Sequence, residues 1–173
     1  MELFLVRHGE TDANAKHIIQ GWLDMDLNVN GINQAQKTAD SFTENVDVIY
    51  SSDLKRAAQT ASAFRHKFPD IPYFEDKRLR ERNFGDAVGY PRDKYDWDEF
   101  WSSPDNQVTI PNAETLNSFN ERVKEFINDL KSSNYRRVLI VAHGGTINRL
   151  RHLVAGEDYV QHDNASVTYL TLS

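Results

Sequence analysis

Short apolar runs and longer segments with a helical repeat alternate along the chain. The two clearest runs, 3–6 and 138–142, are continuous and aliphatic or aromatic, which is typical of strands buried on both faces. Further strands are predicted at 46–50 and, more weakly because proline cannot donate to a ladder, at 71–74. The last run, 167–172, alternates in polarity, as expected of a strand at the edge of a sheet.

Apolar side chains three and four positions apart fill the intervals between these runs and predict helices. The four helical segments are 32–42, 54–64, 116–130 and 147–153. Asn28 and Thr115 precede the first and third segments as caps, and Ser52 or Asp53 precedes the second. Strands that alternate with helices predict an α/β layered domain, and 173 residues is the usual size of one domain.

Residues from about 77 to 111 follow neither repeat. Glycine and proline are mixed there with tyrosine, tryptophan and phenylalanine, and only 97–101 has the composition of a short helix. A segment of this length without evident regular structure is usually functional. We interpret it as a lid-like insertion over the core of a single domain that spans 1–173.

Composition limits what the protein binds. The net charge of −6 disfavours nucleic acid, because binding to phosphate backbones needs a basic face. No apolar run approaches the roughly 20 residues that cross a bilayer, and residues 1–6 lack the regions of an export signal. We therefore expect a cytoplasmic protein without nucleic-acid or membrane partners, and the pattern leaves its oligomeric state open. The chain has no cysteine, which excludes a thiol nucleophile.

Two histidines stand at the carboxyl ends of the two clearest strands. His8 follows 3–6 closely, His143 follows 138–142 directly, and a glycine comes after each histidine. Ligands of open α/β sheets bind in the crevice beyond the strand carboxyl ends, so these positions favour one shared site. Arg56, in the first turn of a helix that follows another strand, is expected at the same edge. Taken singly, each histidine could simply close a turn and the arginine could be an exposed helix residue. The prediction of a shared ligand site therefore depends on the three residues lying together.

Five blocks of the sequence resemble, in family order, the motifs of the histidine phosphatase (phosphoglycerate mutase-like) superfamily. The blocks are RHGETDAN at 7–14, QGW through QA at 20–35, SSDLKRAAQTA at 51–61, LRERNFG at 79–85 and VAHGG at 141–145. Together they extend over nearly the whole chain. The resemblance implies a three-layer α/β/α sandwich whose sheet is mostly parallel with an antiparallel edge strand.

The resemblance also implies the roles of the candidate site residues. His8 would be the nucleophile that forms a phosphohistidine, while Arg7, Arg56 and His143 surround the phosphoryl group. Phosphoryl transfer is catalysed mostly by positioning and by positive donors, which these side chains supply without a metal or cofactor. By family analogy, secondary contacts with phosphate or substrate come from Asn14, Gln20, Gly21 and Gly144.

Glu81 matches the family position of the general acid and base. It would protonate the leaving oxygen and then deprotonate the attacking water. The ordinary alternative is a surface ion pair with Arg80 or Arg82. Glu10 and Glu114 are rival carboxylates, although Glu10 belongs to the structural part of the first motif.

The sequence departs from the family pattern in two loops. Members commonly carry an acidic residue and glycine where this chain has 87–89, and a glycine where it has Ala113. The second departure puts the conformation of that loop in doubt. Neither change touches the candidate catalytic residues.

We favour a phosphatase for small-molecule phosphate monoesters. The insertion is shorter than in the cofactor-dependent phosphoglycerate mutases and offers mainly Arg92 and Lys94 as cations, and Phe84 stands where mutases tend to have tyrosine. The alternatives are such a mutase, a catalytically silent relative that binds phosphorylated ligands, and a metal-dependent hydrolase. Candidate substrates include a sugar phosphate, a phosphoglycerate, phosphoserine and α-ribazole phosphate. Three aromatic residues either stack on the leaving group or pin the insertion to the core: Trp97, Phe100 and Trp101.

Overall fold

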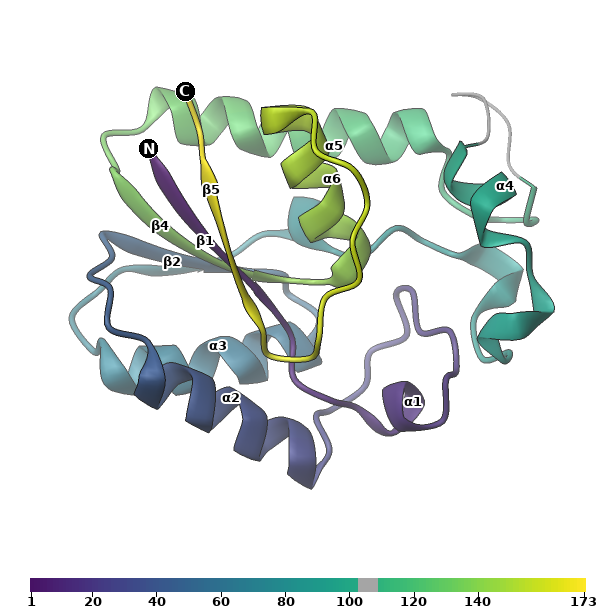
Figure 1. Cartoon of the computed structure of the whole chain (residues 1–173), viewed down its shortest axis with the longest axis horizontal. Helices are drawn as coiled ribbons and strands as arrows, with labels where there is room; N and C mark the ends of the chain where they lie inside the picture. The colour runs from purple at the N-terminus through teal and green to yellow at the C-terminus, as the bar shows by residue number, and fades with distance from the viewer. Residues whose placement is uncertain (103–108) are drawn as a thin grey trace.

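The computed structural model describes residues 1–102 and 109–173. Its centre is a five-stranded sheet in the order β3-β2-β4-β1-β5 (Figure 1). The strands are β1 (Glu2–Arg7), β2 (Val48–Ser51), β3 (Tyr73–Glu75), β4 (Arg137–Ala142) and β5 (Val167–Thr171). All neighbours pair in parallel except β5, which runs antiparallel to β1. The prediction of a mostly parallel sheet with an antiparallel edge strand is confirmed.

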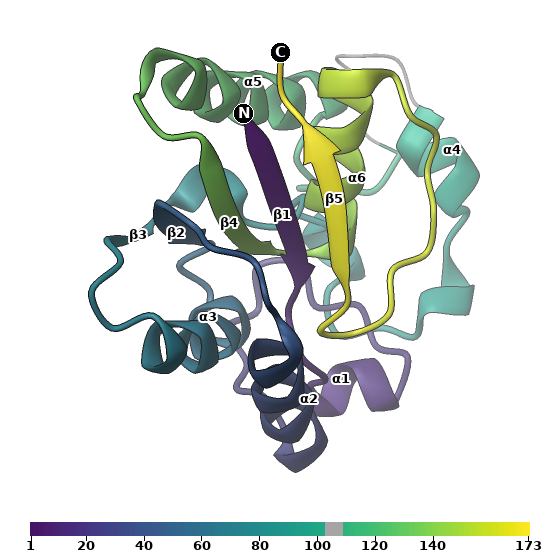
Figure 2. The same cartoon turned by 60° about the vertical axis from the view of Figure 1, so that its left-hand side comes forward.

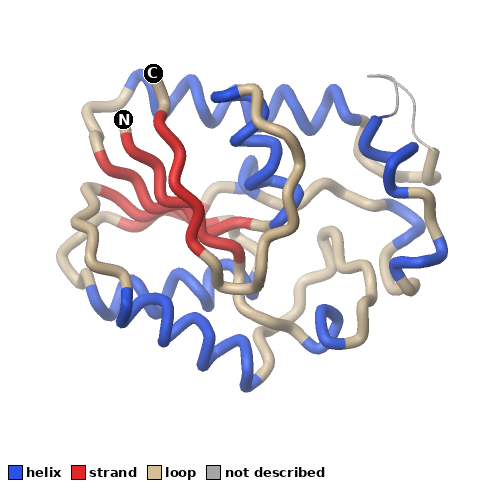
Figure 3. The backbone as a smooth tube through the Cα atoms, in the orientation of Figure 1, coloured by secondary structure: helices blue, strands red, loops and turns tan. Residues whose placement is uncertain are grey.

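Helices cover both faces of this sheet, with α2 and α3 on one side and α5 and α6 on the other (Figures 1 and 3). The helices are α1 (Asp12–Ala15), α2 (Val29–Ser41), α3 (Lys55–Lys67), α4 (Trp97–Ser102), α5 (Leu116–Ser132) and α6 (Gly144–Ala155). Along β1, Leu3 and Leu5 join the α5–α6 core, whereas Phe4 and Val6 join the α2–α3 core. Burial on both faces explains the continuous apolar run and confirms the three-layer sandwich.

The register of β1 against β4 brings the two candidate histidines together. Arg7 is opposite Ala142, and the ladder continues as the His8 amide donates to the Ala142 carbonyl oxygen at 2.9 Å. His8 and His143 therefore leave adjacent parallel strands at the same level. Their ring centroids lie 5.1 Å apart.

Two of the three predicted helix caps are confirmed. The Asn28 side chain accepts from the Gly31 amide at the start of α2, and Thr115 caps α5 in the same way. The prediction of Ser52 or Asp53 as the cap of α3 was wrong, because Leu54 holds that position without a side-chain bond. Both polar side chains have other partners, namely His143 for Ser52 and Arg80 for Asp53.

The segment that we interpreted as an insertion contains more regular structure than its pattern predicts. Short 3₁₀ helices occur at Lys77–Leu79, Gly85–Ala87 and Arg92–Lys94, and the short helix expected at 97–101 is confirmed as α4. Figure 2 shows α4 at the side of the molecule, beyond α6. Residues 103–108 lie outside the described part of the chain. The single-domain organisation and the role of the segment as a lid stay predictions.

The loop with the missing family glycine has an ordinary backbone at Ala113. The left-handed residue is its neighbour Asn112, with φ of 59°. A tight contact is made by Gly85, also left-handed, where a Cβ atom would lie 2.2 Å from the Pro111 carbonyl oxygen. The glycine that this turn requires is therefore Gly85, and alanine at 113 is tolerated.

The structure also bears on membrane association. None of the helices in 1–102 and 109–173 combines the length and the apolar character needed to cross a membrane.

Candidate active site

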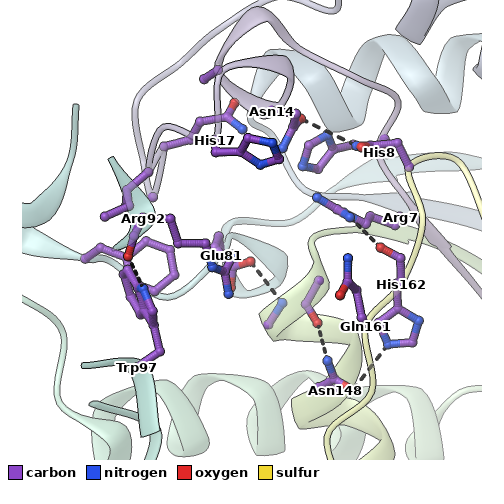
Figure 4. A pocket seen from close by; sticks show the side chains of 18 of the residues that line it. Arg7, His8, Asn14, His17, Glu81, Arg92, Trp97, Asn148, Gln161 and His162 are labelled. Carbon is purple, nitrogen blue, oxygen red and sulfur yellow. Dashed lines mark hydrogen bonds between the residues drawn. The ribbon is translucent and has the colours of Figure 1, made fainter. Parts of the chain in front are cut away.

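The carboxyl ends of β1 and β4 open into a cavity of about 510 Å³. Figure 4 shows Arg7 and His8 on one side of it and Arg92 and Trp97 on the other. Eight of the nine predicted site residues line the cavity: Arg7, His8, Asn14, Gln20, Gly21, Arg56, Glu81 and Gly144. The ninth, His143, lies beside His8 and is almost completely buried. The sequence motifs thus converge on one concave site.

The His8 ring is held in a single tautomer. Its Nδ1 lies 2.7 Å from the Gly9 carbonyl oxygen, which only accepts, so Nδ1 carries the hydrogen and Nε2 is left unprotonated. Burial lowers the pKa of His8 well below 6.5, and the positive charges of Arg56 and Arg7 lower it further. At neutral pH the ring is therefore uncharged, with a free lone pair on Nε2.

The His143 ring has one polar side-chain partner among the described residues. Its Nε2 lies 2.9 Å from the Ser52 hydroxyl, and Nδ1 is buried without a hydrogen-bond partner among the described residues. Burial is the largest cause that lowers the pKa of His143 well below 6.5, followed by the charge of Arg56. Contact between His143 and a phosphoryl group stays a prediction.

Two guanidinium groups are anchored by backbone carbonyls at the cavity. Arg56, at the start of α3, donates to the carbonyl oxygens of Gly21 and Leu23, both at 2.8 Å. Arg7 makes a short hydrogen bond to the His162 carbonyl oxygen. Burial lowers the pKa of Arg56 to about 10, so it stays a cation at neutral pH. These anchors fix positive charge beside His8, which suits an anionic ligand.

Glu81 forms no ion pair with its neighbours, so the alternative of an ordinary surface pair was wrong. Its Oε1 accepts from the Arg82 amide and its Oε2 from the Gly145 amide, both at 2.9 Å. Arg80 instead pairs with Asp53, and the Arg82 guanidinium donates to backbone carbonyls. The Glu81 carboxylate is therefore held by backbone amides at the cavity wall.

The rival carboxylates have structural partners. Glu10 accepts from the Asn28 side chain at 2.8 Å, beside the cap of α2. Glu114 pairs with Arg122 at 2.7 Å. Neither belongs to the described residues that line the cavity.

One wall of the cavity was missed by the sequence analysis. Residues 159–164, in the connection from α6 to β5, all line it. Asn148 of α6 fixes this connection by donating to the Val160 carbonyl oxygen at 2.8 Å and accepting from the Val160 amide at 3.1 Å. The polar segment carries no motif. Residues 159–164 reach the site because β5, which follows them, pairs antiparallel with β1.

The aromatic residues of the insertion lie in a small core and at the cavity wall. Trp97 and Trp101 line the cavity, and Phe84 lies beside both. Phe100 is fully buried in a small core with Ile19. Trp97 and Trp101 pack against the same small core, so these two side chains both anchor the insertion and line the cavity.

Stability should fall as the pH drops below 6.5. Folding keeps His8 and His143 neutral, whereas both rings take up protons below this value in the unfolded chain, so acid stabilises the unfolded state. The two rings together should cost a few kcal/mol of unfolding free energy, on the order of 3, by pH 5.5. Urea unfolding at pH 7.5 and 5.5 measures the difference, and His8→Asn should reduce it by about half. An unfolding free energy equal at both pH values would contradict this account.

Comparisons with known proteins agree with the fold and the motifs. A model of the histidine phosphatase superfamily (branch 1) matches residues 3–173. A Hydrogenobacter thermophilus protein named putative phosphoserine phosphatase 2 is 38% identical over 181 aligned positions, covering 96% of this chain and 87% of that protein. The 2,3-bisphosphoglycerate-dependent phosphoglycerate mutase of Rhizobium etli is 34% identical, covering 88% of this chain and 77% of that one.

A solved structure has the same architecture. The mycobacterial glucosyl-3-phosphoglycerate phosphatase in complex with VO3 superimposes with a TM-score of 0.82 and 28% identity, covering 98% of this chain and 92% of that chain. The family match extends over nearly the whole sequence, and the relatives include both phosphatases and mutases. The chain belongs to the histidine phosphatase superfamily.

Proposed function

We propose that this protein is a metal-independent phosphatase that hydrolyses small-molecule phosphate monoesters through a phosphohistidine on His8. One observation carries the proposal: the His8 ring bonds through Nδ1 to the Gly9 carbonyl oxygen in a cavity also lined by Arg7 and Arg56, which leaves Nε2 free. An unprotonated nitrogen is the form that attacks phosphorus. The two cations stabilise the charge on the three equatorial oxygens.

In the first step the Nε2 lone pair of His8 forms a bond to phosphorus as the bond from phosphorus to the ester oxygen breaks. The ester oxygen leaves with that electron pair and takes a proton from the Glu81 carboxylic acid, so a neutral alcohol departs. Phosphate remains on Nε2, with Arg7, Arg56 and the Gly144 amide as its proposed contacts. The proposal gives Asn14, Gln20 and the Gly21 amide secondary contacts, and it places His143 beside the phosphoryl group.

In the second step water attacks the phosphohistidine. The Glu81 carboxylate takes one proton from the water as its oxygen bonds to phosphorus, and the phosphorus–Nε2 bond breaks. Inorganic phosphate leaves, and both His8 and Glu81 return to their starting states. The second half of the cycle requires a carboxylate that reaches the cavity, as Glu81 does.

Turnover of p-nitrophenyl phosphate in the presence of EDTA tests the proposal. A site that uses fixed guanidinium groups should keep its full rate in the chelator, measured as p-nitrophenolate released. A metal-dependent hydrolase, the competing mechanism, would lose activity in EDTA and regain it with added metal. Absence of turnover for every phosphate monoester in a screen would favour a silent binding relative.

The mutase alternative has support from relatives such as the Rhizobium etli enzyme. Beyond Arg7 and Arg56, the described cavity wall adds only Arg92 as an arginine or lysine cation. We therefore favour transfer to water over transfer to a second phosphoglycerate. Incubation with 3-phosphoglycerate, with and without 2,3-bisphosphoglycerate, should release phosphate without efficient isomer exchange.

The cavity is larger than a phosphate group and leaves room for the alcohol. Its lining also includes Phe84, Trp97 and Trp101 and the polar side chains of Asn148 and Gln161. A screen by phosphate release over sugar phosphates, phosphoglycerate, phosphoserine and α-ribazole phosphate would identify the preferred substrate. The cytoplasmic location stays a prediction.

A further inference from the structure

The backbone that carries Glu81 is held by a side chain that does not line the cavity. Arg122, on α5, donates through Nη1 to the carbonyl oxygens of Arg78 and Arg80 at 2.7 and 2.8 Å. Its Nη2 donates to the Glu81 carbonyl oxygen at 2.9 Å. Three carbonyls within four residues therefore converge on one guanidinium group.

Arg122 is itself fixed by Glu114. Its Nε donates to Oε1 of that carboxylate at 2.7 Å and its Nη2 to Oε2 at 2.9 Å. All five N–H groups of the guanidinium thus have acceptors. The exposed fractions of the two side chains are 15% and 8%, so water competes little for these bonds.

Glu114 also holds the chain on the other side of Glu81. Its Oε2 accepts from the Asn83 amide at 3.1 Å, and its carbonyl oxygen accepts from the Arg82 guanidinium at 2.9 Å. The ion pair therefore contacts the backbone both before and after the proposed acid and base. This stretch lies between two short 3₁₀ helices and has no strand ladder to define its position.

We propose that Arg122, supported by Glu114, is a positioning residue for proton transfer by Glu81. This inference rests on the proposed function, since it takes Glu81 as the acid and base. A partly buried ion pair often adds little net stability. The five directed bonds of Arg122 are therefore better explained as fixing the position of the Glu81 backbone than as stabilising the fold. Without the guanidinium group, the Glu81 and Arg80 carbonyl oxygens would keep only Trp22 and Thr146 as described side-chain donors. We expect a small displacement of Glu81, to which proton transfer is sensitive. Lysine cannot replace Arg122, because the three donors of one ammonium group cannot serve three carbonyl oxygens and both oxygens of Glu114 at once.

Leaving groups of different basicity separate positioning from general damage. p-Nitrophenolate leaves without a proton, whereas phenolate, whose acid has a pKa of about 10 as in tyrosine, depends on a general acid. Arg122→Lys should lower kcat/KM for phenyl phosphate at least about tenfold more than for p-nitrophenyl phosphate. Glu81→Gln should show the same selectivity, with a difference of about a hundredfold. Addition of Arg122→Lys to Glu81→Gln should cause no further selective loss.

Arg149→Lys is the matched control. Both arginines lie over the Phe119 ring, at 4.5 Å for Arg122 and 5.9 Å for Arg149, but no described hydrogen bond joins Arg149 to residues 78–81. The control should leave the ratio of the two kcat/KM values unchanged. Glu114→Gln, which keeps an acceptor oxygen, is the second test variant and should give a smaller selective loss. Circular dichroism melts establish the folded fraction of each variant.

Two results would overturn the inference, and they differ from failure of the proposed function. Equal losses on both esters in folded Arg122→Lys and Glu114→Gln would assign the pair a purely structural role. A selective loss in Arg149→Lys as large as that in Arg122→Lys would show that the selectivity does not depend on the bonds from Arg122 to the carbonyl oxygens of residues 78, 80 and 81. If Glu81→Gln itself shows no selectivity, the proposed acid is wrong, and the fault then lies with the proposed function.

Discussion

Replacement of His8 with alanine is expected to lower kcat/KM for p-nitrophenyl phosphate by at least about 10⁴-fold. The reason is that His8 Nε2 is the atom proposed to bond to phosphorus, and its lone pair is kept free by the Nδ1–H bond to the Gly9 carbonyl. Alanine leaves the cavity and its cations but no nitrogen there. Without covalent catalysis only the binding groups remain, and water attacks slowly.

Loss of activity must be distinguished from loss of fold. His8→Ala removes a ring whose protonation is disfavoured in the folded protein. The variant should therefore lose less stability than the wild type when the pH is lowered from 7.5 to 5.5. Inorganic phosphate should still protect it from unfolding, because Arg7 and Arg56 remain. A folded variant that keeps a tenth or more of the wild-type rate would exclude His8 as the nucleophile.

Arg56→Lys is expected to produce the second large effect, a loss of roughly 10³-fold in kcat/KM. Lysine keeps a positive charge but lacks the planar guanidinium that bonds the carbonyl oxygens of Gly21 and Leu23 and that, in the proposed mechanism, also contacts the phosphoryl group. The same change leaves two carbonyl oxygens without their donors, which should cost about 1 to 3 kcal/mol of unfolding free energy. Steady-state kinetics and urea unfolding measure the two effects.

Arg65→Lys is the control for this change. It places the same substitution on the same helix, at an exposed residue whose guanidinium lies over the Tyr73 ring, 4.2 Å from its centroid. Its kcat/KM should stay within about twofold of wild type, because surface changes far from a site have small effects. A comparable loss in both variants would indicate that the defect of Arg56→Lys arises from the helix and not from the site.

The sheet and the position of the catalytic edge were predictable from the sequence. The apolar runs 3–6 and 138–142 identify β1 and β4, because burial on both faces removes polar positions from a strand. Strand ends in parallel sheets meet at one edge, so His8 and His143 were expected at the same edge. Their direct proximity follows from the pairing of β1 with β4, which the structure shows. The resemblance added Glu81, which no periodicity identifies.

The partners of these residues could not be predicted in the same way. The bond between the His143 ring and the Ser52 hydroxyl joins residues 91 positions apart. The contacts of Arg122 with the Glu81 segment depend on how α5 packs against a stretch without regular structure. Side-chain contacts of this kind follow from tertiary packing, and local patterns carry no signal for them.

The most direct test of the account is the site of covalent phosphate during the first turnover. Enzyme mixed rapidly with a phosphate monoester, quenched in alkaline denaturant and digested should yield a phosphoryl group on His8 by mass spectrometry. That species should appear and decay no more slowly than turnover itself. Release of a full equivalent of phosphate with no protein-bound phosphate, or a phosphoryl group on any other residue, would contradict the account.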